Sequence, residues 1–78
     1  MFLEIITPDS KIFSGEVSLV QLPGIVGSFE ILKDHAPAIS TLAKGKIKII
    51  DSQKNTQYIE IRSGVVEVLK NKIIVLAE

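Results

Sequence analysis

The sequence has no cysteine, a single histidine and no net charge. Without cysteine, neither disulfides nor cysteine-ligated zinc can supplement a hydrophobic core. Nine Lys and Arg residues balance nine Asp and Glu residues, whereas a nucleic-acid-binding protein normally carries a basic excess. We therefore expect no nucleic-acid partner.

Long apolar runs are also absent. The longest is only a few residues, so no segment is long enough to cross a bilayer. The first residues, Met1-Phe2-Leu3-Glu4, have neither the basic region nor the apolar region of a signal peptide. These absences predict a cytosolic chain of the bacterial type.

The chain has 78 residues, which predicts a single domain over 1–78 that buries about 60% of its unfolded surface. Its hydrophobic fraction of 46% and mean hydropathy of +0.36 are high for so small a body. Some apolar residues must then lie outside the core, where a partner could cover them. The composition therefore favours a subunit over a free monomer.

Apolar and polar residues alternate along most of the chain, and no stretch sustains a helical period. Short strands separated by polar turns predict an all-β sandwich or barrel, with its final strand over Lys72–Ala77. A change of apolar parity predicts a β-bulge near Leu19 to Gln21. The residues assigned to the core are Phe13, Val17, Ile47, Ile59, Ile61, Val68 and Val75.

The only histidine, His35, follows Asp34 and precedes Ser40 by five positions. A Ser/His/Asp triad is conceivable, but residues so close in one turn rarely aim at a common point. A turn histidine that bonds backbone or meets a partner is the favoured interpretation. One histidine without cysteine also makes no zinc site, so we expect no catalytic residue, metal or cofactor.

Lys44, Lys46 and Lys48 share one face of a predicted strand. They could form a weak patch for anions or lipid headgroups, but a solvated face that prevents edge-to-edge aggregation is favoured. Gly45-Lys46 lacks the upstream glycine and the following Ser or Thr of a phosphate-binding loop. No nucleotide site is predicted.

Several segments in a fixed order resemble the ε subunit of the rotary, proton-driven ATP synthase. Each segment is weak alone, but their ordered combination covers the whole chain and is specific. The segments are Thr7-Pro8, Phe13-Ser14-Gly15-Glu16-Val17, Leu22-Pro23-Gly24, Gly27-Ser28-Phe29, Ile31-Leu32, His35-Ala36-Pro37, Ser63-Gly64-Val65-Val66-Glu67-Val68 and Val75-Leu76-Ala77-Glu78.

The chain departs from the family pattern at four places. The family usually has an acidic residue at Ser28 and a glycine at Glu30. The family usually has the sequence Pro-Gly-His where this chain has Lys33-Asp34-His35. It usually has a double glycine where this chain has Ser63-Gly64. These departures concern loop contacts and not the fold.

The resemblance implies a β sandwich of about ten strands at the foot of the central stalk. In the family this domain binds the γ subunit, rests on the c-ring of the membrane sector and helps couple proton flow to ATP synthesis. It is a non-catalytic part, peripheral at the cytoplasmic face of the inner membrane. Most members continue into an inhibitory helical hairpin, which can carry an ATP site. Because this chain stops at Glu78, we expect it to couple without inhibiting.

The resemblance also implies contact residues. The final strand is apolar on both faces, because Ile74 and Leu76 lie opposite Ile73 and Val75, so either complete burial or a face covered by γ is expected. The residues matching the c-ring loop are Gly24, Ile25, Val26, Gly27, Ser28 and Phe29, and those assigned to γ are Thr7, His35, Ser40, Ile74 and Leu76.

Two other functions are considered. A biotinyl or lipoyl carrier domain is also a β structure of about this length, with a modifiable lysine commonly next to methionine or following an acidic residue. Here the only methionine is Met1, and Lys33 precedes Asp34 instead of following it. A small hydrolase would have to depend on His35.

Overall fold

The computed structural model describes residues 1–78 and consists of strands and turns, so the all-β prediction is confirmed. It offers no helix capable of crossing a membrane. The eight strands are β1 (Phe2–Ile6), β2 (Lys11–Gly24), β3 (Gly27–Ile31), β4 (Ala38–Leu42), β5 (Gly45–Asp51), β6 (Thr56–Ile61), β7 (Gly64–Leu69) and β8 (Lys72–Ala77).

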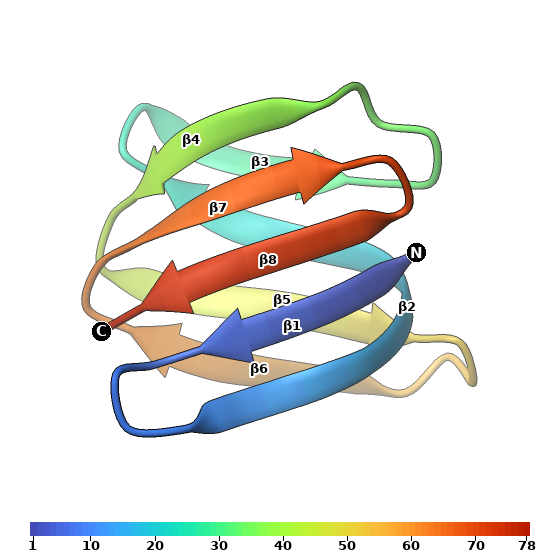
Figure 1. Ribbon diagram of the computed structural model, residues 1–78, viewed down its shortest axis with the longest axis horizontal. Helices are drawn as coiled ribbons and strands as arrows, with labels where there is room; N and C mark the ends of the chain where they lie inside the picture. The colour runs from blue at the N-terminus through green and yellow to red at the C-terminus, as the bar shows by residue number, and fades with distance from the viewer.

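The strands form two layers (Figure 1). The front layer in this view carries β4, β7, β8 and β1, in that order. The back layer carries β3, the second half of β2, β5 and β6. Neighbouring strands are antiparallel except β1 and β8, which run parallel. The first and last strands of the chain therefore lie side by side in the front layer.

Strand β2 belongs to both layers. Its first half pairs with β1, and its second half pairs with β3 and β5. The register shifts between Val17 and Leu19, and the intervening Ser18 hydroxyl donates to the Ile50 carbonyl at 3.2 Å. A bulge bends a strand, which lets β2 pass from the front layer to the back. The bulge falls just before the predicted position, Leu19 to Gln21.

The sandwich prediction is confirmed, but the number of strands is eight and not about ten. β2 is continuous over 14 residues, so one strand contributes to both layers. A bulged strand keeps its hydrogen-bond ladder on either side of the extra residue, so the bend does not divide it.

The core lies between the layers and consists of 15 buried hydrophobic residues, with no buried polar side chain. Buried residues are two apart along most strands, because successive side chains point to opposite faces. Phe13 and Ile59 were both predicted to be core, but they are only partly buried because their strands lie at the edges of the layers. The other predicted core residues are buried, namely Val17, Ile47, Ile61, Val68 and Val75.

The two ends of the sandwich carry different segments. β4, β8 and β1 end, and β7 begins, at the end where a hairpin joins β2 to β3 (Figure 1). We call this the hairpin end. The register agrees, since Gly24 pairs with Leu42 and Gly64 pairs with Ala77. The N-terminus, the β3–β4 connection and the β7–β8 turn lie at the opposite end.

Gly64, at the start of β7, lies very close to β8. A Cβ atom added there would lie 2.7 Å from the backbone oxygen of Leu76, which is closer than real Cβ atoms come. Gly15 on β2 differs, because an added Cβ would meet only the Phe13 ring at 3.8 Å. The close packing of β7 against β8 therefore leaves no room for a side chain at position 64, whereas position 15 has room for one.

Replacing Gly64 by alanine should lower the free energy of unfolding by about 1–3 kcal/mol, because the backbone of β8 must move. Gly15→Ala is the matched control and should leave stability unchanged or raise it by up to about 1 kcal/mol. Urea denaturation of both variants measures the difference. Equal stability of the two would contradict the close approach of β7 and β8.

Candidate interaction surface

Strand β8 is apolar on both faces, and the chain covers only one of them. Ile73 and Val75 point into the core and are buried. On the outer side Leu76 is 55% exposed and Ile74 is half-buried. Of the two explanations that the sequence allows, a strand buried on both faces is therefore wrong. The outer side of β8 is open to a partner.

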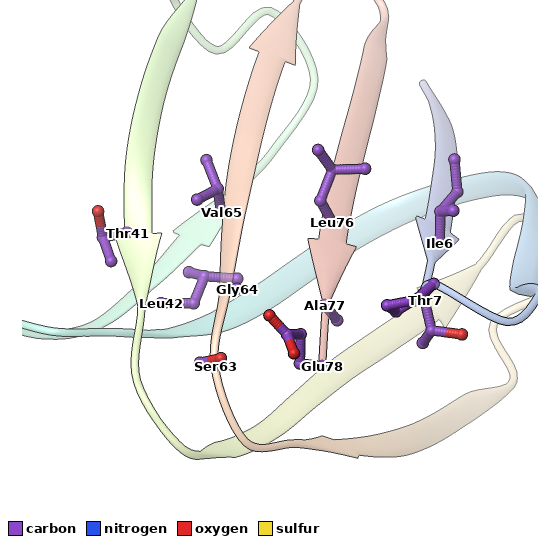
Figure 2. Close-up of a pocket in the computed structure, with 11 residues that line it drawn as sticks. Ile6, Thr7, Thr41, Leu42, Ser63, Gly64, Val65, Leu76, Ala77 and Glu78 are labelled. Atoms are coloured by element: carbon purple, nitrogen blue, oxygen red, sulfur yellow. The ribbon is translucent and has the colours of Figure 1, made fainter.

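Leu76 belongs to a row of outward side chains that crosses the front layer. The register aligns Thr41 with Val65, Val65 with Leu76, and Leu76 with Ile6. Figure 2 shows these side chains on four neighbouring strands at the hairpin end. Together with the turn that follows β1, they line a groove of about 550 Å³.

A second row lies beside the first, toward the middle of the strands. Here Ile39 pairs with Glu67, Glu67 with Ile74, and Ile74 with Glu4. Ile39 is 73% exposed. Exposed apolar side chains that gather on one face of a small protein mark an interaction site. We call the two rows together the outer face, and its apolar residues are Ile6, Ile39, Val65, Ile74 and Leu76.

Two lysines hold Glu4 at the margin of the outer face. Its carboxylate oxygens lie 2.6 Å from Lys11 Nζ and 3.2 Å from Lys72 Nζ, and its side chain is only 14% exposed. Hydrogen bonds from Lys11 and then Lys72 hold the pKa of Glu4 below its ordinary value of 4.5, and partial desolvation opposes them. The cluster joins β1, β2 and β8 and occupies both lysines.

The hairpin between β2 and β3 presents an apolar pair to solvent, since Ile25 is 63% and Val26 is 97% exposed. Gly27 has a φ of 134°, which side-chain-bearing residues rarely adopt. The Ile25 amide donates to the Thr41 carbonyl at 3.2 Å, which fixes the tip beside the outer face. Phe29 is half-buried and packs against the core, so it supports the tip from within.

The predicted contact residues do not all lie together. Thr7 lies in the groove at the hairpin end, where its hydroxyl donates to the Ser10 carbonyl at 3.1 Å. His35 belongs to the β3–β4 connection at the opposite end. Ser40 is half-buried on β4 and shares the parity of the buried Leu42. The structure thus brings Thr7 close to Leu76 and leaves His35 and Ser40 apart from them.

Sequence reasoning missed Ile6, Ile39 and Val65 as members of this surface. A signal for two of them was present, because Ile5-Ile6 and Val65-Val66 are adjacent apolar pairs. Adjacent residues on a strand face opposite sides, so one member of each pair must point outward. Their alignment into one row depends on strand register, which no local pattern specifies.

The polar groups of the chain form no reactive arrangement. His35 Nδ1 lies 2.6 Å from the carbonyl oxygen of the adjacent Ala36, and no hydrogen bond joins it to Asp34 or Ser40. No group of three or more His, Cys, Asp or Glu side chains is placed to hold a metal ion.

An uncovered apolar face beside an exposed apolar tip defines an interaction domain of a larger assembly. Comparison with known proteins identifies the family of this domain. The chain belongs to the family described as ATP synthase, Delta/Epsilon chain, beta-sandwich domain, whose model matches residues 1–78. The resemblance to the ε subunit is thus confirmed, and the chain is a non-catalytic subunit of the ATP synthase type. The carrier-domain and hydrolase alternatives are set aside.

Curated relatives named ATP synthase epsilon chain differ in length. The relative from Chlorobium limicola is 43% identical over 97% of this chain and 86% of its own length. The relative from Caulobacter vibrioides is 36% identical over 100% of this chain and 90% of its own length. The relative from Campylobacter curvus is 41% identical, but the chain spans only 60% of it.

Solved structures show the same fold at lower sequence identity. A chain of the Euglena gracilis mitochondrial ATP synthase, in a structure of OSCP, F1 and the c-ring, matches with a TM-score of 0.90 and 18% identity. That match covers 96% of this chain and 48% of the other. A chain of the Tetrahymena thermophila central stalk and c-ring matches with a TM-score of 0.80, 19% identity, and coverage of 99% and 62%. At these identities the similarity establishes the fold alone.

The Glu4 cluster should make stability depend on pH in the acidic range. Because its pKa is lowered by folding, Glu4 stabilises the fold above pH 4.5, and this contribution is lost as the pH falls through the folded-state pKa. Glu4→Gln should therefore be less stable than the parent near neutral pH and lose less on acidification. Thermal unfolding across this pH range measures the stability near neutral pH and its loss on acidification. Glu60→Gln is the control, because Glu60 forms no ion pair. A Glu4→Gln profile parallel to that of the parent would contradict the prediction.

Proposed function

We propose that this chain is a rotor part that binds the γ subunit and the c-ring and couples proton flow to ATP synthesis. The observation that carries the proposal is the outer face, an apolar surface that the chain leaves uncovered beside the exposed hairpin tip. Its chemistry suits permanent burial against other subunits. The assemblies that contain the structural relatives are described as a central stalk with c-ring and as F1 with c-ring, which supports this assignment.

The outer face is the proposed γ contact. Ile74, Leu76 and Thr7 stay in this assignment, and their neighbours Ile6 and Val65 join it by register. His35 and Ser40 lie elsewhere and are proposed as a separate contact with γ. An elongated γ subunit could contact both places, since this domain measures only 27 × 24 × 18 Å.

The hairpin tip is the proposed c-ring contact. The segment Gly24–Phe29 contains the solvent-facing apolar pair Ile25 and Val26, while Ser28 is exposed next to them. Gly24 allows close packing behind the tip, because a Cβ there would lie 2.7 Å from the Gly27 carbonyl oxygen. Such a tip is braced from within and presents apolar area to the polar loops of a membrane ring.

The proposed role is mechanical. A part that transmits torque must not yield, and a closely packed sandwich core has few soft modes. The subunit would act at the attachment of F1 to the membrane sector, peripheral at the cytoplasmic face and in contact with the membrane only through the complex.

Truncating the outer face should weaken γ binding and leave the fold intact. We expect the double variant Ile74→Ala, Leu76→Ala to lose at least about tenfold in affinity for the γ subunit of the same synthase, measured by biolayer interferometry. Tyr58→Ala removes an exposed side chain from β6 in the other layer and is the control. Unchanged affinity in a folded double variant would refute the assignment.

Single cysteines can map both contacts, because the chain has none of its own. In the assembled synthase, Ser28→Cys should crosslink to cysteines placed in the c-ring loops, and His35→Cys should crosslink to γ. Ser52→Cys, in the β5–β6 loop at the opposite end, should not reach the ring. Equal crosslinking of Ser28→Cys and Ser52→Cys to the ring would argue against the hairpin tip as the contact.

A further inference from the structure

Glu67 is a charged residue within the outer face that forms no ion pair. It points outward from β7, and its cross-strand neighbours on both sides are apolar, Ile39 on β4 and Ile74 on β8. Its neighbours along β7 on the same face, Val65 and Leu69, are apolar as well. The carboxylate has neither an ion pair nor a side-chain hydrogen bond, so only water solvates it.

The cations of this face are already engaged. Lys72 is the diagonal neighbour of Glu67 across the β7–β8 ladder, but its ammonium lies 3.2 Å from Glu4 Oε1. Lys11 lies 2.6 Å from the other oxygen of Glu4. Lys46 and Lys48 belong to β5 in the opposite layer. Glu67 is therefore the one carboxylate of the outer face that has no ion pair.

Covering the outer face would remove the water around Glu67. A carboxylate buried without a partner is costly, whereas a hydrogen-bonded ion pair offsets much of that cost. A second copy of this chain, packed through its own outer face, would bring a second unpaired carboxylate, and its Lys11 and Lys72 would already be bonded to Glu4. This disfavours self-association through the outer face and favours a different chain as the occupant.

We propose that Glu67 is a specificity-determining contact, which pairs with a lysine or arginine set among apolar side chains on the partner that covers the outer face. The inference rests on the proposed function and deepens it, since it states what the γ surface must present at this point. The apolar residues supply contact area, while the single charge sets register and rejects surfaces without a matching cation.

The test compares Glu67→Gln and Glu67→Lys with the parent chain for binding to the γ subunit. Glu67→Gln should weaken binding by about 30-fold or more, mainly through faster dissociation, because the partner's cation is left buried and unpaired. Glu67→Lys should bind more weakly still. The parent's affinity should fall with added salt more steeply than that of Glu67→Gln, a difference that a purely structural role would not produce.

Glu60→Gln and Glu60→Lys are the matched controls, because Glu60 is an exposed glutamate on β6 in the other layer. They should bind γ as the parent does, and thermal unfolding should show that all four variants remain folded. Parent-like affinity and salt dependence in both Glu67 variants would overturn this inference and leave the proposed function intact. Failure of the parent chain itself to bind γ would overturn the proposed function, and this inference with it.

Discussion

The limit on burial in a two-layer sandwich governs this molecule. Only one side of each strand can face the core, because successive side chains alternate between the two sides of a sheet. The strands β1, β7 and β8 lie side by side and carry apolar residues on both sides. Once their inner residues fill the core, the rest must lie outside. The outer face is thus a necessary result of this composition in this fold.

The path of β2 links the fold to the proposed interfaces. The bulge at Ser18 carries the strand from the front layer to the back, so its far end forms the β2–β3 hairpin beside β4. The hydrogen bond from the Ile25 amide to the Thr41 carbonyl then holds the hairpin tip next to the outer face. Two surfaces with different proposed partners therefore share one braced end, as force transmission between two subunits requires.

Charges within the front layer have two distinct functions. Glu4 is satisfied by Lys11 and Lys72, and this cluster ties together three strands. Glu67 lies on the same face without a cation, because those lysines are already engaged. The internal pairing stabilises the domain, and the unmatched charge is left for recognition.

Much of the fold could be predicted from local patterns. Alternation predicted both the all-β class and the final strand over Lys72–Ala77, as observed. The resemblance implies about ten strands, whereas the structure has eight, with β2 continuous through its bulge. The spatial grouping of side chains was less predictable. Ser40 is assigned to the γ contact together with Leu76, but it lies on the same inward side of β4 as Leu42.

By itself, the sequence determined which residues form strands, which of them alternate into a core, and that apolar residues exceed what the core can hold. These properties follow from neighbours along the chain. Only the tertiary structure decided that Ile6, Val65 and Leu76 align in one row and that Glu67 lies unpaired beside it. Register and layer order decide this, since they join strands distant in sequence, and a shift of one residue would turn each of those side chains to the other face.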